Sequence, residues 1–414
     1  MAGGRELARN SYYRRLFASR AISNVGNGVL PIALAFGVLA LPGATPTTLS
    51  IVLAAQAIPL VLILPFGGVN ADRVGSARVI STMDMLVSVV GLTMAVLFIT
   101  GTVTIPLLVV LSALTGALNA LWYPAYPGLV PDVVTIDAHL QDANAYLSVA
   151  SNAGLILGNA LGGLLVAAFG AGVAIAFDSL TFLVAGLLVF SFRHVSRPHD
   201  SGESMLEDLK AGWRLVISIR WFVVVVLAFS VIVMALRGAE EVLGPVLALQ
   251  EYGGATGWAV VLAVMSVGLL VGAFVASRIH VRRPMLFGMI ITLTLPVWLV
   301  SLAFAAPLPV VAAGAFAWGM AIELFQVVWF TTLQTHIPRE SISRVSSYDA
   351  MGSLMFGPIG LALAGPLVVA VGLQTAFLVA AAVCLVAIVA SLLSRSIWRL
   401  TSQPPQQSQP STTR

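Results

Sequence analysis

A few ionisable side chains lie inside long apolar segments of this sequence. Placing a charge at the centre of a lipid bilayer costs roughly 2.5 to 3.5 kcal/mol on insertion scales, so such residues usually serve a function. A buried carboxyl group tends to hold a proton, because burial disfavours its charged form. The sequence therefore predicts proton transfer or ion pairing within a membrane. The residues are Asp84, Asp178, Arg237, Glu240, Glu241 and Glu323, with Asp349 near the start of a further apolar segment.

The densest group of charges surrounds Arg237. Glu241 lies four residues later, so the two side chains share a helix face and can form an ion pair, which Glu240 completes. Gly244 and Pro245 follow and should weaken the helix. We interpret the cluster either as a group that responds to protons or substrate, or as a structural ion pair at the outer rim.

Glu323 has no basic residue nearby in its own segment. Gln326 and Trp329 lie near the same helix face. The Glu323 carboxyl group could carry a proton, and Trp329 could stack on a flat or cationic substrate. The alternative is that Glu323 pairs with a distant residue for stability. Asp178 likewise is either a proton-coupling residue or a structural one.

The elements that position these residues are membrane-spanning helices. Of 414 residues, 59% are hydrophobic and 9% charged, whereas soluble domains have roughly 25% charged residues. Each span needs about 20 apolar residues, and lipid requires their backbone groups to be paired within the helix. The sequence therefore predicts an all-α membrane protein with twelve transmembrane helices. We predict spans at 15–41, 49–68, 79–100, 104–126, 143–169, 171–192, 220–249, 255–277, 283–304, 307–332, 346–370 and 373–394.

Positive charges mark one side of the predicted membrane protein. All but one of the 21 Lys and Arg residues lie at the N-terminus, after the even-numbered spans or in the C-terminal tail; Arg237 is the exception. The positive-inside rule then predicts that both termini are cytoplasmic. We expect a multi-pass protein of the cell membrane, the plasma or inner membrane.

The polar break 193–219 divides the chain into two halves. We predict an N-terminal six-helix bundle (1–192), a cytoplasmic linker (193–219), a C-terminal six-helix bundle (220–394) and a disordered cytoplasmic tail (395–414). In the linker, Ser204 and Glu207 resemble a capping box before an amphipathic surface helix; an unstructured linker is the alternative. The halves form two pseudo-repeats that rock around a midplane site.

One motif follows the second span. Gly68, Asp72, Arg73, Gly75 and Arg78 have the spacing G-x-x-x-D-R-x-G-x-x-R. This strongly resembles the signature loop of the major facilitator superfamily, and the span count agrees with that fold. The resemblance implies that the loop gates the two halves, with its Asp facing the start of span eleven, where Asp349 lies. Asp84 is expected to join this network.

A second motif lies in span five. Gly154, Gly158, Asn159, Gly162 and Gly163 resemble the antiporter motif G-x-x-x-G-P-x-x-G-G of exporters in the same superfamily, with Asn159 in place of the proline. The alternative is ordinary packing of small residues between helices. Further stretches resemble bacterial macrolide efflux proteins of the drug:proton antiporter branch, including those around Pro124–Pro131, Phe177–Phe182 and Gln334–Ser347.

The resemblance implies a secondary active transporter that exports amphipathic small molecules in exchange for protons. Asn27, at a position where relatives often have an acid, cannot titrate, so proton coupling must rest on other carboxyl groups. We expect Asn27, Gln326 and Trp329 to line the substrate cavity. The alternatives are an importer or uniporter of a small metabolite and a non-transporting receptor.

The sequence has no phosphate-binding loop, zinc-ligand spacing or nucleophile arrangement typical of an enzyme. We therefore expect no enzymatic activity, cofactor, metal or nucleic-acid partner. The expected partners are a small-molecule substrate, protons and the lipid bilayer, and we expect a monomer.

Overall fold

The fold was determined as a computed structural model. It describes residues 2–134, 139–196, 214, 216–279, 281–337, 345, 348–349, 351–352 and 355–402. For residues 2–5, 65, 67–72 and 141 it describes the helical backbone alone. The predicted linker helix around Ser204 and most of the tail, 403–414, lie outside the described residues.

The N-terminal half consists of one short helix and six long ones. In this half α3 packs on α5, α2 packs on both α6 and α7, and α4 packs on α7. The helices are α1 (Ala2–Arg9), α2 (Ser11–Leu39), α3 (Pro46–Val74), α4 (Ser76–Ile99), α5 (Ile105–Val133), α6 (Leu140–Phe169) and α7 (Ala171–Phe190).

The C-terminal half repeats this plan. Its first span is continuous from Arg220 to Glu251 and contains α9 (Arg220–Gly238), the π-helical turn η2 (Ala239–Leu243) and α10 (Gly244–Glu251). There follow α11 (Ala255–Ala276), α12 (Pro284–Ile291), α13 (Thr294–Ala303), α14 (Leu308–His336), α16 (Gly357–Val371), α17 (Leu373–Leu392) and α18 (Arg395–Arg399). Within the described part of the chain, eleven spans are long and apolar enough to cross a membrane, and α16 is a shorter twelfth. The predicted all-α fold with two six-helix halves is confirmed.

Two segments that we predicted as loops are helical. The segment from Gly67 to Arg78 continues α3 as far as Val74, and Gly75 alone separates α3 from α4. Gly75 ends the helix because its φ of 94° lies in the left-handed region. Likewise α5 runs through Pro124 and Pro127 to Val133, since neighbouring helices can satisfy the backbone groups that a proline frees.

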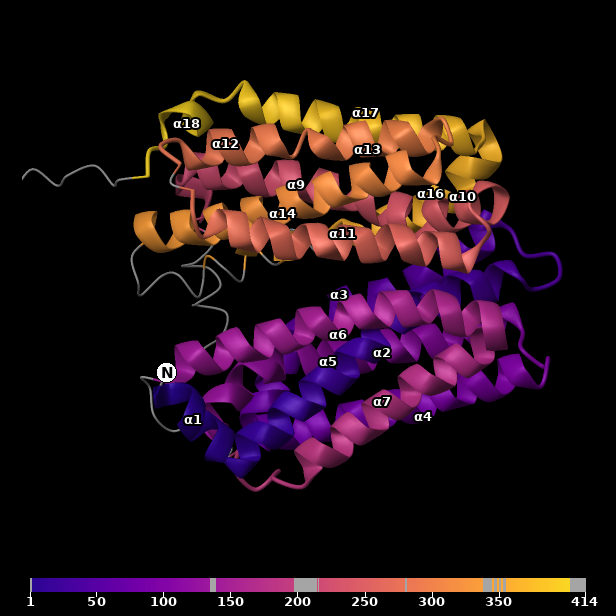
Figure 1. Cartoon of the computed structure of the whole chain (residues 1–414), viewed down its shortest axis with the longest axis vertical. Helices are drawn as coiled ribbons and strands as arrows, with labels where there is room; N and C mark the ends of the chain where they lie inside the picture. Colours follow the sequence, from indigo (N-terminus) through magenta and orange to yellow (C-terminus); the bar gives the residue numbers. More distant parts are fainter. Residues whose placement is uncertain are drawn as a thin grey trace, which may run out of the picture.

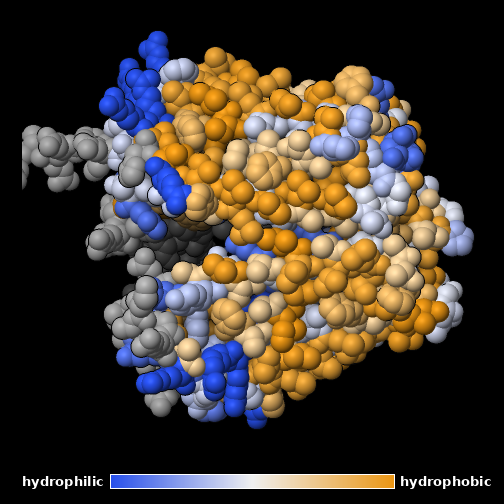
Figure 2. Space-filling model, viewed as in Figure 1, coloured by the Kyte–Doolittle hydropathy of each residue, from blue (hydrophilic) through white to orange (hydrophobic). Residues whose placement is uncertain are grey.

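The two halves lie side by side with their helices roughly parallel (Figure 1). The helices α1 and α18 lie at the same end of the molecule, here called the terminal end, and the opposite end is called the far end (Figure 1). On the face shown in Figure 2, hydrophobic residues cover the broad middle of the molecule, whereas hydrophilic residues gather towards its two ends. This distribution suits a protein surrounded by lipid.

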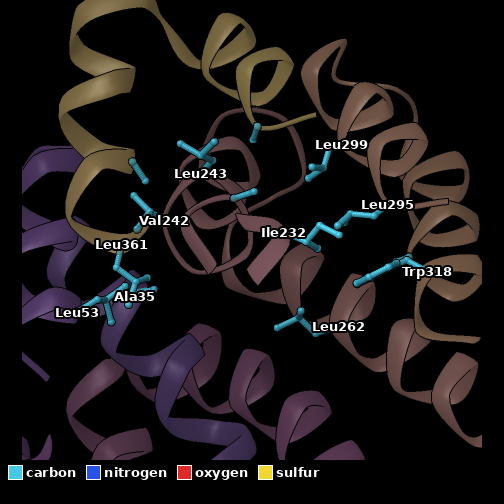
Figure 3. Close-up of a cluster of buried hydrophobic side chains, with 14 of the residues drawn as sticks. Ala35, Leu53, Ile232, Val242, Leu243, Leu262, Leu295, Leu299, Trp318 and Leu361 are labelled. Carbon is cyan, nitrogen blue, oxygen red and sulfur yellow. The ribbon is translucent and has the colours of Figure 1, made fainter. Parts of the chain in front are cut away.

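The halves contact each other through small residues towards the far end. A Cβ atom added to Gly163 of α6 would lie 2.9 Å from the carbonyl oxygen of Ala255 of α11. On the other flank, the backbone N–H of Gly365 donates a hydrogen bond of 2.7 Å to Ser50 Oγ of α3. Buried apolar side chains continue from one half to the other, as where Leu53 lies near Leu361 (Figure 3). These contacts close the far end.

Candidate transport cavity

A cavity of about 570 Å³ lies between the two halves. Its wall is formed by α2, α3, α5 and α6 of the N-terminal half and by α9, η2, α11 and α16 of the C-terminal half. Ligand pockets for drug-sized molecules have volumes of roughly 300 to 1,000 Å³. The cavity therefore has the size of a small-molecule site and lies where a movement of the halves would change access to it.

The N-terminal wall of the cavity is rich in amide side chains. Asn24 Nδ2 donates to the backbone oxygen of Arg20 at 2.8 Å, and Asn159 Nδ2 donates across the interface to Ser266 Oγ at 3.3 Å. Amides supply both donors and acceptors without carrying charge. The lining amides are Asn24, Asn27, Gln56, Asn119 and Asn159.

The C-terminal wall carries the ionisable groups. Arg237 forms an ion pair with Glu241, and their side chains are 50% and 22% exposed. Glu240 also lines the cavity and makes no hydrogen bond or ion pair with any residue that the structure describes. The sequence thus correctly grouped these three residues, and the structure places them in the cavity wall instead of at an outer rim.

The turn that presents these acids is distorted. Glu240 and Glu241 lie in η2, where hydrogen bonds run from residue i to i+5. Pro245 has no N–H group with which to bond the carbonyl group of Glu241, four residues earlier. Gly244 gives room for the ring of Trp258, which a Cβ atom would strike. The predicted weakening of the helix therefore takes the form of a π turn, and π turns are frequent at functional sites.

The predicted cavity residues divide between two sites. Asn27 lines the central cavity. Gln326 and Trp329 line a second cavity of about 190 Å³ within the C-terminal half, together with Asp349. Val233 lines both cavities. Sequence could not separate the two sites, because it does not give the rotation of each helix about its axis.

Glu323 lines neither of these two cavities. It is half-buried, and its Cβ lies beside Gly272 of α11. Asp178 is 2% exposed, and its Oδ1 atom has no hydrogen-bond partner among the residues that the structure describes. A void of about 10 Å³ next to Asp178 is also lined by Gln56 and Thr115, which line the central cavity. The void has roughly the volume that one water molecule needs.

The sequence analysis did not identify Arg20 as a candidate site residue, because we counted it among the basic residues that predict the membrane topology. Its guanidinium lies over the rings of Trp122 and Tyr126, at 4.7 and 4.5 Å from their centroids. It also interacts electrostatically with Asp84, which is buried. Two ionisable side chains are thus held inside the N-terminal bundle. The sequence could have indicated this role, because Arg20 is a charged residue within the first predicted span, 15–41.

The gating motif lies at the terminal end. Gly75 packs on the backbone oxygen of Ser196, which a Cβ atom would approach to 3.1 Å. Ser196 Oγ accepts a hydrogen bond from the backbone N–H of Ala77 at 3.1 Å. Arg73 and Arg78 are exposed. For Gly68 and Asp72 the structure describes the backbone alone, so the gating role of the motif stays a prediction.

The glycine motif of α6 has two packing faces. Gly154 and Gly158 contact the backbone of α2 at Ala21 and Val25, and Gly162 lies against Val29. Asn159 and Gly163 instead face α11 of the other half. One face therefore packs within a bundle, as small residues do in membranes, and the other meets the opposite half. Whether the motif makes the chain an exporter stays a prediction.

Several named transport proteins are similar in sequence to most of this chain. The multidrug efflux pump Tap of Mycolicibacterium fortuitum is 28% identical over 391 residues, which cover 88% of this chain and 90% of that protein. The Tap pump of Mycobacterium tuberculosis strain H37Rv is 28% identical over 377 residues, 88% of each chain. The enterobactin exporter EntS of Citrobacter koseri is 25% identical and covers 84% of this chain and 85% of its own.

Solved structures share the fold. The nucleoside transporter NupG superposes with a TM-score of 0.73 at 12% identity, covering 94% of this chain and 99% of its own. A bacterial homologue of the lysosomal transporter Spinster, in an inward-facing and unoccupied conformation, gives a TM-score of 0.70 at 14% identity, covering 95% and 98%. The family model of the Major Facilitator Superfamily matches residues 16–354 and 239–413. The chain therefore belongs to the Major Facilitator Superfamily and is a multi-pass transporter of the cell membrane.

Proposed function

We propose that this transporter exports amphipathic small molecules by alternating access, with proton influx as the driving force. The observation that carries the proposal is the cavity between the halves, whose wall holds Glu240 beside the Arg237–Glu241 ion pair. The relatives named as efflux pumps and as an exporter support the direction of transport.

Glu240 is the proposed proton-coupling residue. Its carboxylate shares the cavity wall with Glu241, whose charge Arg237 already balances. An ionised Glu240 therefore adds a second negative charge, which is tolerated when the cavity is open to water and costly when it is closed. Protonation favours the closed arrangement, and a cationic substrate has the same effect. Linkage requires that the proton binds more tightly in one state than in the other.

Reconstituted transport tests this role. In proteoliposomes with an imposed pH gradient, the wild-type chain should move ethidium, an amphipathic dye, faster as the gradient grows. Glu240→Gln should remove the dependence on the gradient, because glutamine cannot exchange a proton. Glu251→Gln is the matched control, since Glu251 is the last residue of α10 and its side chain is exposed.

The variant Glu323→Gln tests which of two candidate carboxyl groups, Glu240 or Glu323, couples transport to protons. We expect this variant to keep its gradient dependence, because Glu323 does not line the cavity. If Glu323→Gln loses the dependence and Glu240→Gln keeps it, the proposed site of coupling is wrong. If ethidium is not transported and gradient-driven uptake of nucleosides is observed instead, export is wrong.

The amide-rich wall supports a second candidate, an importer or uniporter of a small polar metabolite. Asn24, Asn27 and Asn119 can hydrogen-bond hydroxyl or base groups without any charge on the substrate. The fold is shared with a nucleoside transporter. Flux direction in cells that over-express the chain decides between the two functions.

A further inference from the structure

The second cavity has an aromatic wall. Phe229 of α9 stacks on Phe325 of α14 with their ring centroids 4.1 Å apart. Phe325 in turn stacks on Trp329 at 6.0 Å, and Trp329 stacks on Phe222 at 5.5 Å. The rings therefore form a continuous row between α9 and α14, and three of them, Phe229, Phe325 and Trp329, line the cavity.

A carboxylate lies at one end of this row. Asp349 lines the same cavity and is half-buried. Its Oδ2 atom accepts a hydrogen bond of 2.8 Å from Trp329 Nε1. Among the residues that the structure describes, no Lys, Arg or His forms an ion pair with Asp349. The remaining lining residues are mostly aliphatic, and an ionised carboxylate is costly in apolar surroundings.

The N-terminal half has a comparable arrangement that is already filled. There Trp122 and Tyr126 of α5 stack at 5.4 Å, and the guanidinium of Arg20 lies over both rings and interacts with Asp84. The helices α5 and α14 are the fourth spans of their respective halves. In one half the chain supplies its own cation to aromatic rings and an acid; in the other, aromatic rings and Asp349 line a cavity.

We propose that the second cavity binds the ammonium head group of a lipophilic organic cation. Asp349 is the counterion, and the rings of Phe229, Phe325 and Trp329 provide the cation–π surface. At about 190 Å³ the cavity is smaller than sites for whole drug-sized ligands, so it holds a head group. Because Val233 also lines the central cavity, the site adjoins it. The role of this site as a substrate subsite in transport rests on the function proposed above, whereas the binding of a cation to the site does not.

Binding to the purified full-length protein tests the site without transport. Isothermal titration calorimetry compares 4-(trimethylammonio)benzyl alcohol with 4-tert-butylbenzyl alcohol, which has the same shape and a carbon atom in place of the charged nitrogen. We expect the wild-type protein to bind the cation at least tenfold more tightly. Asp349→Asn should weaken the cation at least tenfold and leave the uncharged compound unchanged. Folding should survive, because the amide oxygen can still accept the bond from Trp329.

The control variant removes an acid that lines neither cavity. Glu251→Gln, at the exposed last residue of α10, should leave the affinity for the cation within twofold of wild type. Thermal unfolding of each variant checks the fold, and Phe325→Leu provides a second test that removes a ring and keeps the charge; it should weaken the cation several-fold. Equal affinity for the two compounds, or loss of cation binding in Glu240→Gln alone, would overturn the proposal. Absence of gradient-driven transport with intact cation binding would instead count against the proposed function.

Discussion

Arg237 is relevant both to the predicted membrane topology of the chain and to the cavity between the halves. It is the one Lys or Arg that the alternation of basic residues does not explain, and it lines the space between the halves. Its ion pair with Glu241 holds one of the two acids of η2 in a charge-balanced state. Under the proposed function, Glu240 is therefore the group whose charge changes.

Removing one partner of this pair should destabilise the protein, and removing both should restore it. We expect Arg237→Gln to lower the free energy of unfolding by roughly 1 kcal/mol, a value kept small because the Arg237 side chain is half exposed. The double variant Arg237→Gln, Glu241→Gln should recover most of this loss, since no unpaired acid is added. Thermal unfolding in detergent measures it. A double variant that is less stable than the single one contradicts the pairing argument.

Which residues meet in the cavity was only partly predictable. Spacing of four residues placed Arg237 and Glu241 together because the helical repeat fixes that face. Gln326 and Trp329 also share a segment, yet they line a different cavity from Asn27. Their placement depends on how α14 is rotated against α9, and that rotation is set by packing between distant helices.

At the scale of elements, the spans were predictable because lipid requires long apolar helices. Eleven long spans and the shorter α16 match the twelve predicted segments. Helix ends and local irregularities were not predictable from the sequence. Gly75, where α3 ends, packs on Ser196, and Gly244, which follows η2, packs on Trp258; both neighbours are far away in the sequence.

The contact between α6 and α11 should keep the far end closed. A side chain at Gly163 would strike Ala259 and crowd the backbone at Ala255. We expect Gly163→Leu to separate these helices and to favour the state that is open at the far end. A cysteine introduced at Ala57, which lines the cavity, should then react several-fold faster with an impermeant maleimide added on that side, in a Cys384→Ser background.

Ala160→Leu is the matched control for this prediction. Ala160 lies one turn earlier in α6 and is exposed, so the larger side chain should leave labelling unchanged. If Gly163→Leu also leaves labelling unchanged, the small-residue contact does not hold the far end shut. Reduced labelling would show that the contact favours the opposite state.

At the scale of the whole molecule, the two halves are joined unevenly. Hydrogen bonds between the described residues of the two halves, such as Asn159 with Ser266 and Gly365 with Ser50, lie in the middle and towards the far end. A cavity closed at one end is what alternating access requires of one of its two states.

Alternating access then makes a reciprocal prediction for distances at the two ends. Spin labels at Asn144 of α6 and Thr335 of α14, both exposed near the terminal end, should move closer together in the opposite state. Labels at Thr102 and Glu251, both exposed at the far end, should move apart by a similar amount. Pulsed electron–electron double resonance measures both distances, and Gly163→Leu supplies the opposite state without knowledge of the substrate. A receptor that does not transport has no need of this exchange. If the two distances rise together, or if neither changes in Gly163→Leu, the halves do not rock around the cavity, and the Arg237 and Glu240 cluster would belong to a static site.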